Sequence, residues 1–357
     1  MVPVKFRDHV NIIERTKPAV ESRLNKVRLD KNERVAPFPD DFWQETLKEM
    51  SQATVQACPE TWPLYRKLAD FHNLGTDRFL ITSGSEIAIR SCIEAFTTPG
   101  GKVIYPDPTF AMVSVYCDLY QAEKNPVGYD EKLDLKIAYF LDSIDDATSL
   151  IILANPNSPT GTYVSNQVVE EILKKALRFR VPVLIDEAYY GFCPHTACDL
   201  LMRYPNLIVT RSFSKVTGMA GLRVGYAMGD PVVISVLTKY RPMYEANSVG
   251  IYFALKVLDN WSIAEEYGQK TIEGRQRFVD FLRARGFPVI NTEANFMHVD
   301  FGADREFILK ALDAAGILVR GMLPITGFEN YTRFSVGPWD VMSQVADEVD
   351  RICAGRR

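Results

Sequence analysis

The densest group of chemically useful side chains in this sequence surrounds Lys215. That lysine closes the run Arg211-Ser-Phe-Ser-Lys215, in which Ser212 and Ser214 carry hydroxyls, and Arg223 follows eight residues later. A lysine amine condenses with an aldehyde, while hydroxyls and a guanidinium are donors suited to a phosphate. The run therefore indicates a site for a ligand that carries both an aldehyde and a phosphate.

Two more polar residues stand upstream of Lys215 at equal intervals of 29 residues. Asp186 lies in Ile185-Asp-Glu-Ala-Tyr189, and Asn157 lies in Asn155-Pro-Asn-Ser-Pro-Thr-Gly161. A carboxylate such as Asp186 can keep a ring nitrogen protonated. Pyridoxal 5'-phosphate needs that anion as well as the lysine and the phosphate donors, because its protonated ring is the electron sink for a carbanion at the substrate Cα.

The elements that must position these residues are visible as five short apolar runs between helical stretches. The runs cover residues 79–82, 102–105, 150–153, 183–186 and 207–210. Nearly continuous apolar strands belong in a sheet that is covered on both faces. Alternation of strands and helices predicts an α/β fold with a mostly parallel sheet, and ligands bind at the carboxyl ends of its strands. The polar candidates each follow an apolar run directly.

Another strand end, at Gly84-Ser85-Glu86, leads into a predicted helix over residues 87–96. Backbone amides at a helix start can hold an anion. Taken singly, Ser85 could be an ordinary helix cap, Asp186 another cap and Lys215 a solvated lysine. Five strand ends with useful polar groups favour one shared site.

One connecting helix is predicted in detail, from a cap at Ser165 to Phe179. Its buried stripe would be Val168, Val169, Ile172, Leu173, Ala176 and Leu177. On the opposite side we expect the pairs Glu170/Lys174 and Glu171/Lys175 at i,i+4 spacing.

The C-terminal third has the pattern of an α+β unit with a small sheet. Its expected helices cover residues 263–285 and 305–315 and a last stretch near the C-terminus, and its expected strands cover 287–290, 295–299, 317–320 and 332–336. We expect an N-terminal segment of residues 1–36 that joins this smaller domain, a large cofactor-binding domain of residues 37–248, and the small domain of residues 249–357.

Composition is that of an ordinary globular protein, with 47% hydrophobic and 24% charged residues among 357. The net charge of −4 gives no general attraction to nucleic acid or to an anionic membrane. The first 34 residues hold nine Lys/Arg and five Asp/Glu, interleaved, which we interpret as a solvated segment. No secretory signal and no membrane-spanning apolar run is visible.

Six cysteines show no CxxC spacing, and four histidines are scattered without ligand spacing. We therefore expect no metal site. Without an export signal, the cysteines are expected to be reduced thiols of a cytoplasmic protein.

The motifs together resemble the fold-type I pyridoxal-phosphate enzymes of the class I/II aminotransferase superfamily, and within them the histidinol-phosphate aminotransferase-like group. The strongest matches cover residues 155–161, 186–189, 212–215 and 220–225, in order and at family-like spacing. The resemblance covers nearly the whole chain. It implies a seven-stranded, mostly parallel sheet and a homodimer with active sites at its interface.

By that resemblance the catalytic residues are Lys215, Asp186 and Tyr189. Lys215 forms the Schiff base with the cofactor and then moves the proton between the substrate Cα and C4′. Asp186 pairs with the ring nitrogen, while Asn157 and Tyr189 donate to the phenolate oxygen. The phosphate would be held by Ser212, Ser214, Arg223 and the amides of Ser85 and Glu86. Phe110 would stack on the ring where relatives commonly have a tyrosine.

The resemblance also implies a substrate site built from Arg320, Arg333 and Asn157. Arg333 matches the arginine that receives the substrate's carboxylate or equivalent anion, and Arg320 one that helps to bind its anionic end. A guanidinium suits both carboxylate and phosphate. Alternatively, both arginines could be strand residues that extend to solvent at a domain edge.

Three segments depart from the group's pattern. Relatives have an Arg-Tyr-Pro segment whose tyrosine reaches the partner subunit's cofactor phosphate, where this chain has Cys58 with Trp62 and Tyr65 nearby. An aromatic residue that helps to recognise histidinol phosphate is replaced around residues 18–20, and residues 241–247 differ near the expected dimer interface. These departures weaken histidinol phosphate as the substrate.

We therefore expect an aminotransferase that takes a small amino compound with a phosphate, phosphonate or carboxylate tail and a 2-oxo acid or ketone acceptor. The alternative is a decarboxylase resembling threonine-phosphate decarboxylase, which shares the cofactor residues. A pyridoxal-phosphate-binding regulator would need a DNA-binding domain, for which about 35 preceding residues are too few. A nicotinamide dehydrogenase is disfavoured because no G-x-G-x-x-G follows a strand.

Overall fold

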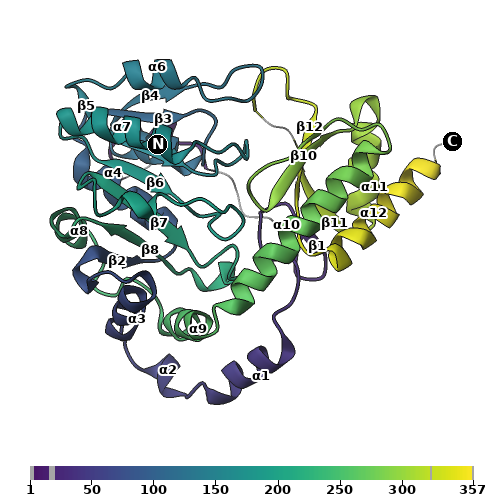
Figure 1. Ribbon diagram of the computed structural model, residues 1–357, viewed down its shortest axis with the longest axis horizontal. Coiled ribbons are helices and arrows are strands. Elements are labelled where there is room, and N and C mark those ends of the chain that lie inside the picture. The colour runs from purple at the N-terminus through teal and green to yellow at the C-terminus, as the bar shows by residue number, and fades with distance from the viewer. Residues whose placement is uncertain (1–3, 16–20, 322–323, 356–357) are drawn as a thin grey trace.

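The computed structural model of this chain describes residues 4–15, 21–321 and 324–355, which form two sheets with their covering helices (Figure 1). The larger sheet has the strand order β2 (Phe79–Thr82), β8 (Gly225–Gly229), β7 (Leu207–Ser212), β6 (Val183–Asp186), β5 (Thr148–Ala154), β3 (Lys102–Pro106) and β4 (Glu123–Val127). All neighbours in it are parallel except β8, which is antiparallel to both β2 and β7. The predicted mostly parallel α/β sheet is confirmed.

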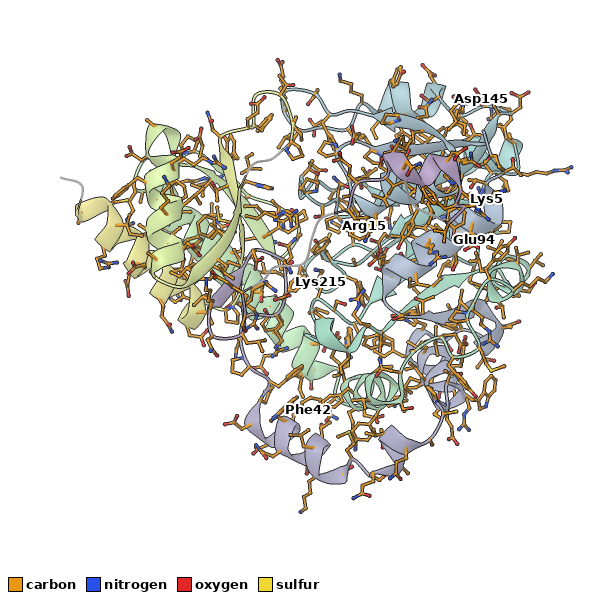
Figure 2. All side chains as sticks on the ribbon, turned by 180° about the vertical axis from the view of Figure 1, so that it is seen from behind. Lys5, Arg15, Phe42, Glu94, Asp145 and Lys215 are labelled. Carbon is orange, nitrogen blue, oxygen red and sulfur yellow. The ribbon has the colours of Figure 1, made fainter. Side chains whose placement is uncertain are left out.

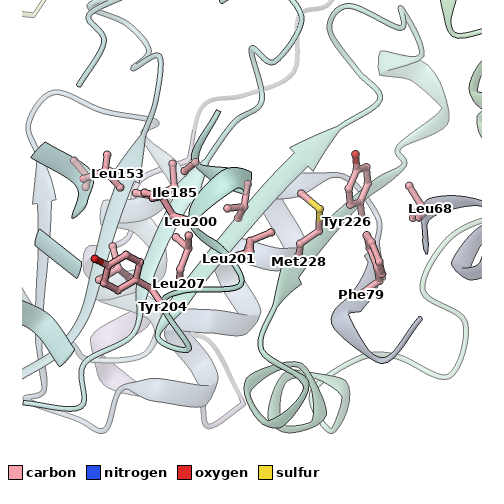
Figure 3. Close-up of a cluster of buried hydrophobic side chains, with 14 of the residues drawn as sticks. Leu68, Phe79, Leu153, Ile185, Leu200, Leu201, Tyr204, Leu207, Tyr226 and Met228 are labelled. Carbon is pink, nitrogen blue, oxygen red and sulfur yellow. The ribbon is translucent and has the colours of Figure 1, made fainter. Parts of the chain in front are cut away.

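Both faces of the large sheet are buried, because alternate strand residues enter different cores. Along β5, Leu150 and Ile152 pack on one face, whereas Ile151 and Leu153 pack on the other. The first face is covered by α4 (Ser85–Phe96), α5 (Met112–Leu119) and α8 (Pro231–Thr238). The second is covered by α3 (Trp62–His72), α7 (Asn166–Arg178) and α9 (Ser248–Asp259), and Figure 3 shows part of that core around Tyr226 and Met228.

Helix α7 follows the prediction closely. The Ser165 hydroxyl accepts a hydrogen bond from the Val168 amide, and Lys174 pairs with Glu170 at 2.9 Å. Two details differ. Leu177 is 41% exposed and lies outside the buried stripe, and Lys175 lies 3.8 Å from Asp142 of α6 (Ile137–Asp142). The stripe ends at Ala176 because the last turn of the helix extends beyond the core.

The smaller sheet has the order β1 (Val27–Leu29), β11 (Ile317–Gly321), β12 (Tyr331–Ser335), β10 (Phe296–Asp300) and β9 (Val289–Ile290). Helices α10 (Ser262–Arg283), α11 (Arg305–Ala314) and α12 (Trp339–Ala354) supply its separate core. The chain's first strand therefore completes a sheet made otherwise from its last third, beside α10 to α12 in Figure 1.

The N-terminal segment touches both parts of the molecule. The short helix η1 (Asp8–Ile12) contacts α5, where a ring nitrogen of His9 lies 3.2 Å from the Leu119 carbonyl oxygen. Further on, β1 pairs in parallel with β11. Helix α9 buries its face in the core of the large sheet. The domain boundaries at residues 36 and 248 stay predictions. In the described ranges, no helix combines the length and apolarity needed to cross a membrane.

Candidate active site

A cavity of about 310 Å³ lies at the carboxyl ends of the large sheet's strands. Nine of the predicted site residues line it, namely Ser85, Glu86, Phe110, Asp186, Tyr189, Ser212, Ser214, Lys215 and Arg223. Strand β6 ends at Asp186, β7 ends at Ser212, and α4 begins at Ser85. Figure 2 labels Lys215 between the two parts of the molecule.

One end of the cavity is an anion cradle formed where β8 approaches the start of α4. A Cβ atom added at Gly225 would lie 2.5 Å from the Ser85 nitrogen, and one added at Gly84 would lie 2.8 Å from a terminal nitrogen of Arg223. These glycines let the backbone amides at the helix start and the Arg223 guanidinium face the same space. An Arg223 nitrogen also lies 3.7 Å from the Glu86 carboxylate.

The hydroxyls of the Lys215 run lie beside that cradle. Arg223 donates to the Ser214 hydroxyl at 3.4 Å, and the Ser214 amide donates to the Ser212 hydroxyl at 3.1 Å. Helix dipole, guanidinium and hydroxyls make this end of the cavity suited to a phosphate.

Asp186 lies at another wall of the cavity with its carboxylate buried. Burial raises its pKa to about 6, while hydrogen bonds from the hydroxyls of Thr210 and Ser85 act in the opposite direction. The Thr210 hydroxyl donates to the carboxylate at 2.7 Å. A buried anion without a cationic partner is costly, so this carboxylate is suited to a protonated ring nitrogen.

The Lys215 amine lies close to two other lining groups. It donates to the Lys31 carbonyl oxygen at 3.1 Å and lies 5.6 Å from the centre of the Tyr189 ring. The Tyr189 hydroxyl accepts a hydrogen bond from the Asn32 side chain at 2.8 Å. The amine and the phenol therefore share the side of the cavity that faces residues 31–33.

Asn157 is buried next to the cavity but is not among the residues that line it. Its side-chain nitrogen donates to the Pro108 carbonyl at 2.9 Å and to the Thr160 hydroxyl at 2.8 Å. Its oxygen accepts from the Thr109 hydroxyl at 2.6 Å. These contacts fasten the loop after β5 to the residues that precede Phe110, which does line the cavity.

The two substrate arginines lie outside the cavity lining and directly opposite each other on neighbouring strands. Arg320 of β11 and Arg333 of β12 are cross-strand partners, so their side chains leave the same face of the small sheet. Arg333 is 9% exposed, and its Nη2 donates to the Asp30 carbonyl at 2.9 Å. Burial and the neighbouring Arg320 lower the pKa of Arg333, and its Nε is buried without a partner among the described atoms.

The sequence interpretation of the N-terminal segment as solvated is wrong at Asn32, whereas Lys31 beside it is exposed. Lys31 and Glu33 line the cavity, and the Asn32 side chain is buried. No local pattern marks these residues, because Asp30 separates them from Leu29 and the short run before them contains Arg28. The substitution expected to affect histidinol phosphate, at residues 18–20, lies outside the described residues.

The two segments expected near the dimer interface, residues 57–65 and 241–247, each contain a tyrosine, and the two hydroxyls have different partners. Tyr65 donates to Glu245 at 3.0 Å and accepts from the Ile81 amide at 3.2 Å, so its hydroxyl is held within the chain. Cys58 is exposed, and a hydrogen bond between Cys58 and Tyr244 raises the pKa of Tyr244.

Comparison with known proteins agrees with this fold. The family model described as "Aminotransferase class I and II" matches residues 27–349. A histidinol-phosphate aminotransferase from Thermoanaerobacter sp. (strain X514) is 32% identical over 322 residues, which are 89% of this chain and 90% of that protein. One from Syntrophus aciditrophicus (strain SB) is 30% identical over 346 residues, 94% of each chain.

Among solved structures, histidinol-phosphate aminotransferase from Sinorhizobium meliloti, in complex with pyridoxal-5'-phosphate, has a similar fold. Its TM-score is 0.81 at 22% identity, and the match covers 93% of this chain and 92% of that one.

The chain therefore belongs to the class I and II aminotransferase family. It is an aminotransferase of the histidinol-phosphate aminotransferase-like kind, and its cofactor is pyridoxal 5'-phosphate. The cavity fits that cofactor, because it combines an anion cradle, a lysine amine and a buried carboxylate. An enzyme of this class takes the amino group from one substrate and passes it to a keto acid.

Proposed function

We propose that this aminotransferase acts on a small amino compound with an anionic tail, which is a phosphate, a phosphonate or a carboxylate. The observation that carries the proposal is the Arg320/Arg333 pair. Like charges directly opposite each other destabilise a sheet unless an anion lies between them. The buried Nε of Arg333 has no partner among the described atoms, so an incoming anion would supply an acceptor.

The tail would reach these arginines from the Lys31 side of the cavity. Arg333 binds the Asp30 carbonyl, and the next residue lines the cavity beside Lys215. A substrate whose amino group lies at Lys215 therefore extends toward the small sheet. Guanidinium groups bind carboxylate and phosphate alike, so the pocket selects an acidic tail rather than one acid.

The cofactor, when bound, supplies the electron sink that allows a proton to leave the substrate Cα. We assign that proton transfer to the Lys215 amine, since it is the amine in the cavity wall next to Tyr189. Asp186 would keep the ring nitrogen protonated, and Tyr189 would donate to the ring's phenolate oxygen. Asn157 would donate to the same oxygen by giving up its hydrogen bond to Pro108 or to Thr160. Phe110 would cover the ring face.

The phosphate of the cofactor is assigned to the cradle at the start of α4. The amides of Ser85 and Glu86, the hydroxyls of Ser212 and Ser214 and the Arg223 guanidinium are its donors. This assignment is supported by the approach of β8 to α4 at Gly84 and Gly225, which leaves no room for side chains there.

We further propose that the protein acts as a cytoplasmic homodimer. Several large apolar side chains are exposed around α2 (Ala53–Gln56) and residues 240–247, which lie near each other where Ser248 bonds the Ala57 carbonyl. They are Val55, Trp62, Met243 and Tyr244. A concentration of exposed apolar side chains favours a protein partner, and a second copy would complete the surface beside Cys58.

The test is a spectral titration of the purified protein against amino acids, phosphorylated amines and aminophosphonates, with product identification. Conversion of the bound cofactor to its amine form by an acidic amino compound supports the proposal. A preference for neutral amines would overturn the anionic-tail assignment, and release of CO₂ would identify a decarboxylase instead.

A further inference from the structure

The segment that follows β1 contacts three groups that act on the substrate or the cofactor in the proposed function. Arg333 donates to the Asp30 carbonyl, Lys215 donates to the Lys31 carbonyl, and Asn32 donates to the Tyr189 hydroxyl. Of these contacts, the one from Asn32 is made by a side chain to a side chain, so the residue type matters.

The orientation of the Asn32 amide is determined by its neighbour Ser335 on β12. The Ser335 hydroxyl oxygen accepts from the Asn32 backbone N–H at 2.8 Å, and the hydroxyl lies 3.0 Å from the Asn32 side-chain oxygen. The hydroxyl proton is therefore donated to that oxygen. The NH₂ end of the amide must then face Tyr189, as its 2.8 Å distance to the phenol oxygen shows.

Several contacts hold Asn32 in this position. It is 2% exposed, and its backbone adopts the left-handed conformation with φ of 54°, which asparagine tolerates better than most residues. The Asn295 side chain donates to its carbonyl at 3.2 Å. Ser335 and Asn295 are fully buried, so water does not compete for these bonds.

A phenol has one proton and can accept further hydrogen bonds. Because Asn32 can only donate to the Tyr189 oxygen, the phenol proton is not used in that contact and is free to point into the cavity. We propose that Asn32 is a positioning residue that directs the Tyr189 proton toward the bound cofactor. This inference depends on the donor role proposed above for Tyr189.

The absorbance of the cofactor-loaded protein as a function of pH tests this inference. A hydrogen bond donated to the cofactor's phenolate oxygen stabilises the deprotonated form of the chromophore. Losing this bond therefore raises the pH at the midpoint of the absorbance titration. Tyr189→Phe should raise it by about one unit, a tenfold change in the proton equilibrium, and Asn32→Ala by about half a unit. In the Tyr189→Phe background, Asn32→Ala should add no shift.

Asn32→Asp keeps the shape of the side chain and reverses its hydrogen bond. Its second carboxylate oxygen would accept the phenol proton, so the midpoint should rise as far as in Tyr189→Phe although the phenol remains. The other charged groups around Tyr189 are Lys31, Glu33, Glu86, Asp186, Lys215, Arg223 and Arg333, which none of these variants changes. Asn32→Asp adds a carboxylate, so the rise that its charge alone causes is measured in the Tyr189→Phe background and subtracted. If Asn32→Ala does not fold, Ser335→Ala replaces it, because loss of the hydroxyl frees the amide to turn, and a smaller rise is expected.

The outcomes separate this inference from the proposed function. If Tyr189→Phe shifts the midpoint and neither Asn32→Ala nor Asn32→Asp does, Asn32 has no positioning role and the proposed function stands. If Asn32→Ala shifts it equally with and without the phenol, Asn32 does not act through Tyr189. If Tyr189→Phe itself causes no shift, the donor role of Tyr189 is wrong.

Discussion

At the scale of single residues, the cavity combines groups whose chemistry is set by what surrounds them. Lys215 has two close neighbours, the Lys31 carbonyl and the Tyr189 ring, and Asp186 is buried beside Thr210. A second lysine, Lys31, also lines the cavity. Assignments at this scale can therefore be tested by exchanging one lysine or one carboxylate at a time.

Borohydride reduction of the purified, cofactor-loaded protein should attach the cofactor to Lys215, as peptide mapping would show. Lys215→Ala should yield no labelled peptide, because it removes the amine that lies 5.6 Å from the Tyr189 ring. Lys31→Ala is the matched control and should keep the label on Lys215. A label on Lys31 in the wild-type protein would contradict the assignment.

Asp186 should make the cofactor-free protein less stable at neutral pH. Its pKa rises from an ordinary 3.8 to about 6 on folding, so the folded protein prefers the neutral carboxyl. The contribution of the neutral Asp186 carboxyl to the free energy of unfolding is fully present below about pH 4 and is lost as the pH rises through 6. Asp186→Asn should therefore raise the free energy of unfolding above pH 6 by up to about 3 kcal/mol, with no gain near pH 4.

Urea unfolding of the cofactor-free proteins at pH 4, 6 and 8 would measure this difference. With the cofactor bound, the same substitution should lose most of the activity, since an amide cannot hold the ring nitrogen protonated. Turnover within a few-fold of wild type would exclude that role.

At the scale of elements, the five apolar strands were predictable, and strands without an apolar, β-branched pattern, such as β4 and β8, were not. The five apolar runs are strands in the structure because each is buried on both faces. Strand β4, with sequence Glu-Lys-Asn-Pro-Val, lies at the sheet edge and is mostly exposed, so it lacks the apolar signal. Strand β8 contains two glycines and a methionine in five residues and lacks the β-branched pattern.

The contribution of residues 31–33 was not predictable from local pattern. It depends on the pairing of Val27 with Ile317, which brings the segment to the small sheet, and on Ser335, which orients Asn32. Contacts between residues so distant in sequence produce no periodic pattern in the sequence around residues 31–33.

The arginines of β11 and β12 should determine how tightly the substrate binds. Arg333→Ala should lower kcat/KM for the anionic substrate, with a loss of transition-state binding free energy of about 2–5 kcal/mol, because Arg333 is buried. Arg320 is exposed, so Arg320→Ala should cost about 1 kcal/mol or less. Arg283 is exposed on α10, so Arg283→Ala is the control and should leave kcat/KM unchanged. Unchanged kcat/KM in both β-strand variants would remove these arginines from the substrate site.

The cap of α7 should affect stability without affecting the reaction. Ser165→Ala removes the acceptor for the Val168 amide and should lower the free energy of unfolding by about 1 kcal/mol. The absorbance of the bound cofactor and kcat should match the wild type, since α7 contributes no cavity residue. Denaturant midpoints and initial rates check both parts, and a fall in kcat at unchanged stability would contradict the expectation.

At the scale of the whole molecule, the exposed apolar side chains near residues 240–247 test the homodimer. Met243 is 80% exposed, and Met243→Glu should shift sedimentation toward the monomer and lower activity, since a charge placed in a buried interface is unfavourable. Val232→Glu, at a site 71% exposed on α8, is the control and should leave the dimer intact. A fully active monomer of the wild-type protein at assay concentration would refute the dimer.

The pairing of β1 with β11 has a consequence for the order of folding during synthesis. The large sheet ends at Gly229, so the ribosome has delivered all its strands while β11 and β12 are still untranslated. Strand β1 emerges almost first and must wait for the end of the chain, because the loop between Val27 and Ile317 closes only then. The small-sheet side of the molecule, with Lys31 and Arg333, is thus assembled after the cavity wall that carries Lys215. A nascent chain would therefore have Lys215 exposed before it could select a substrate.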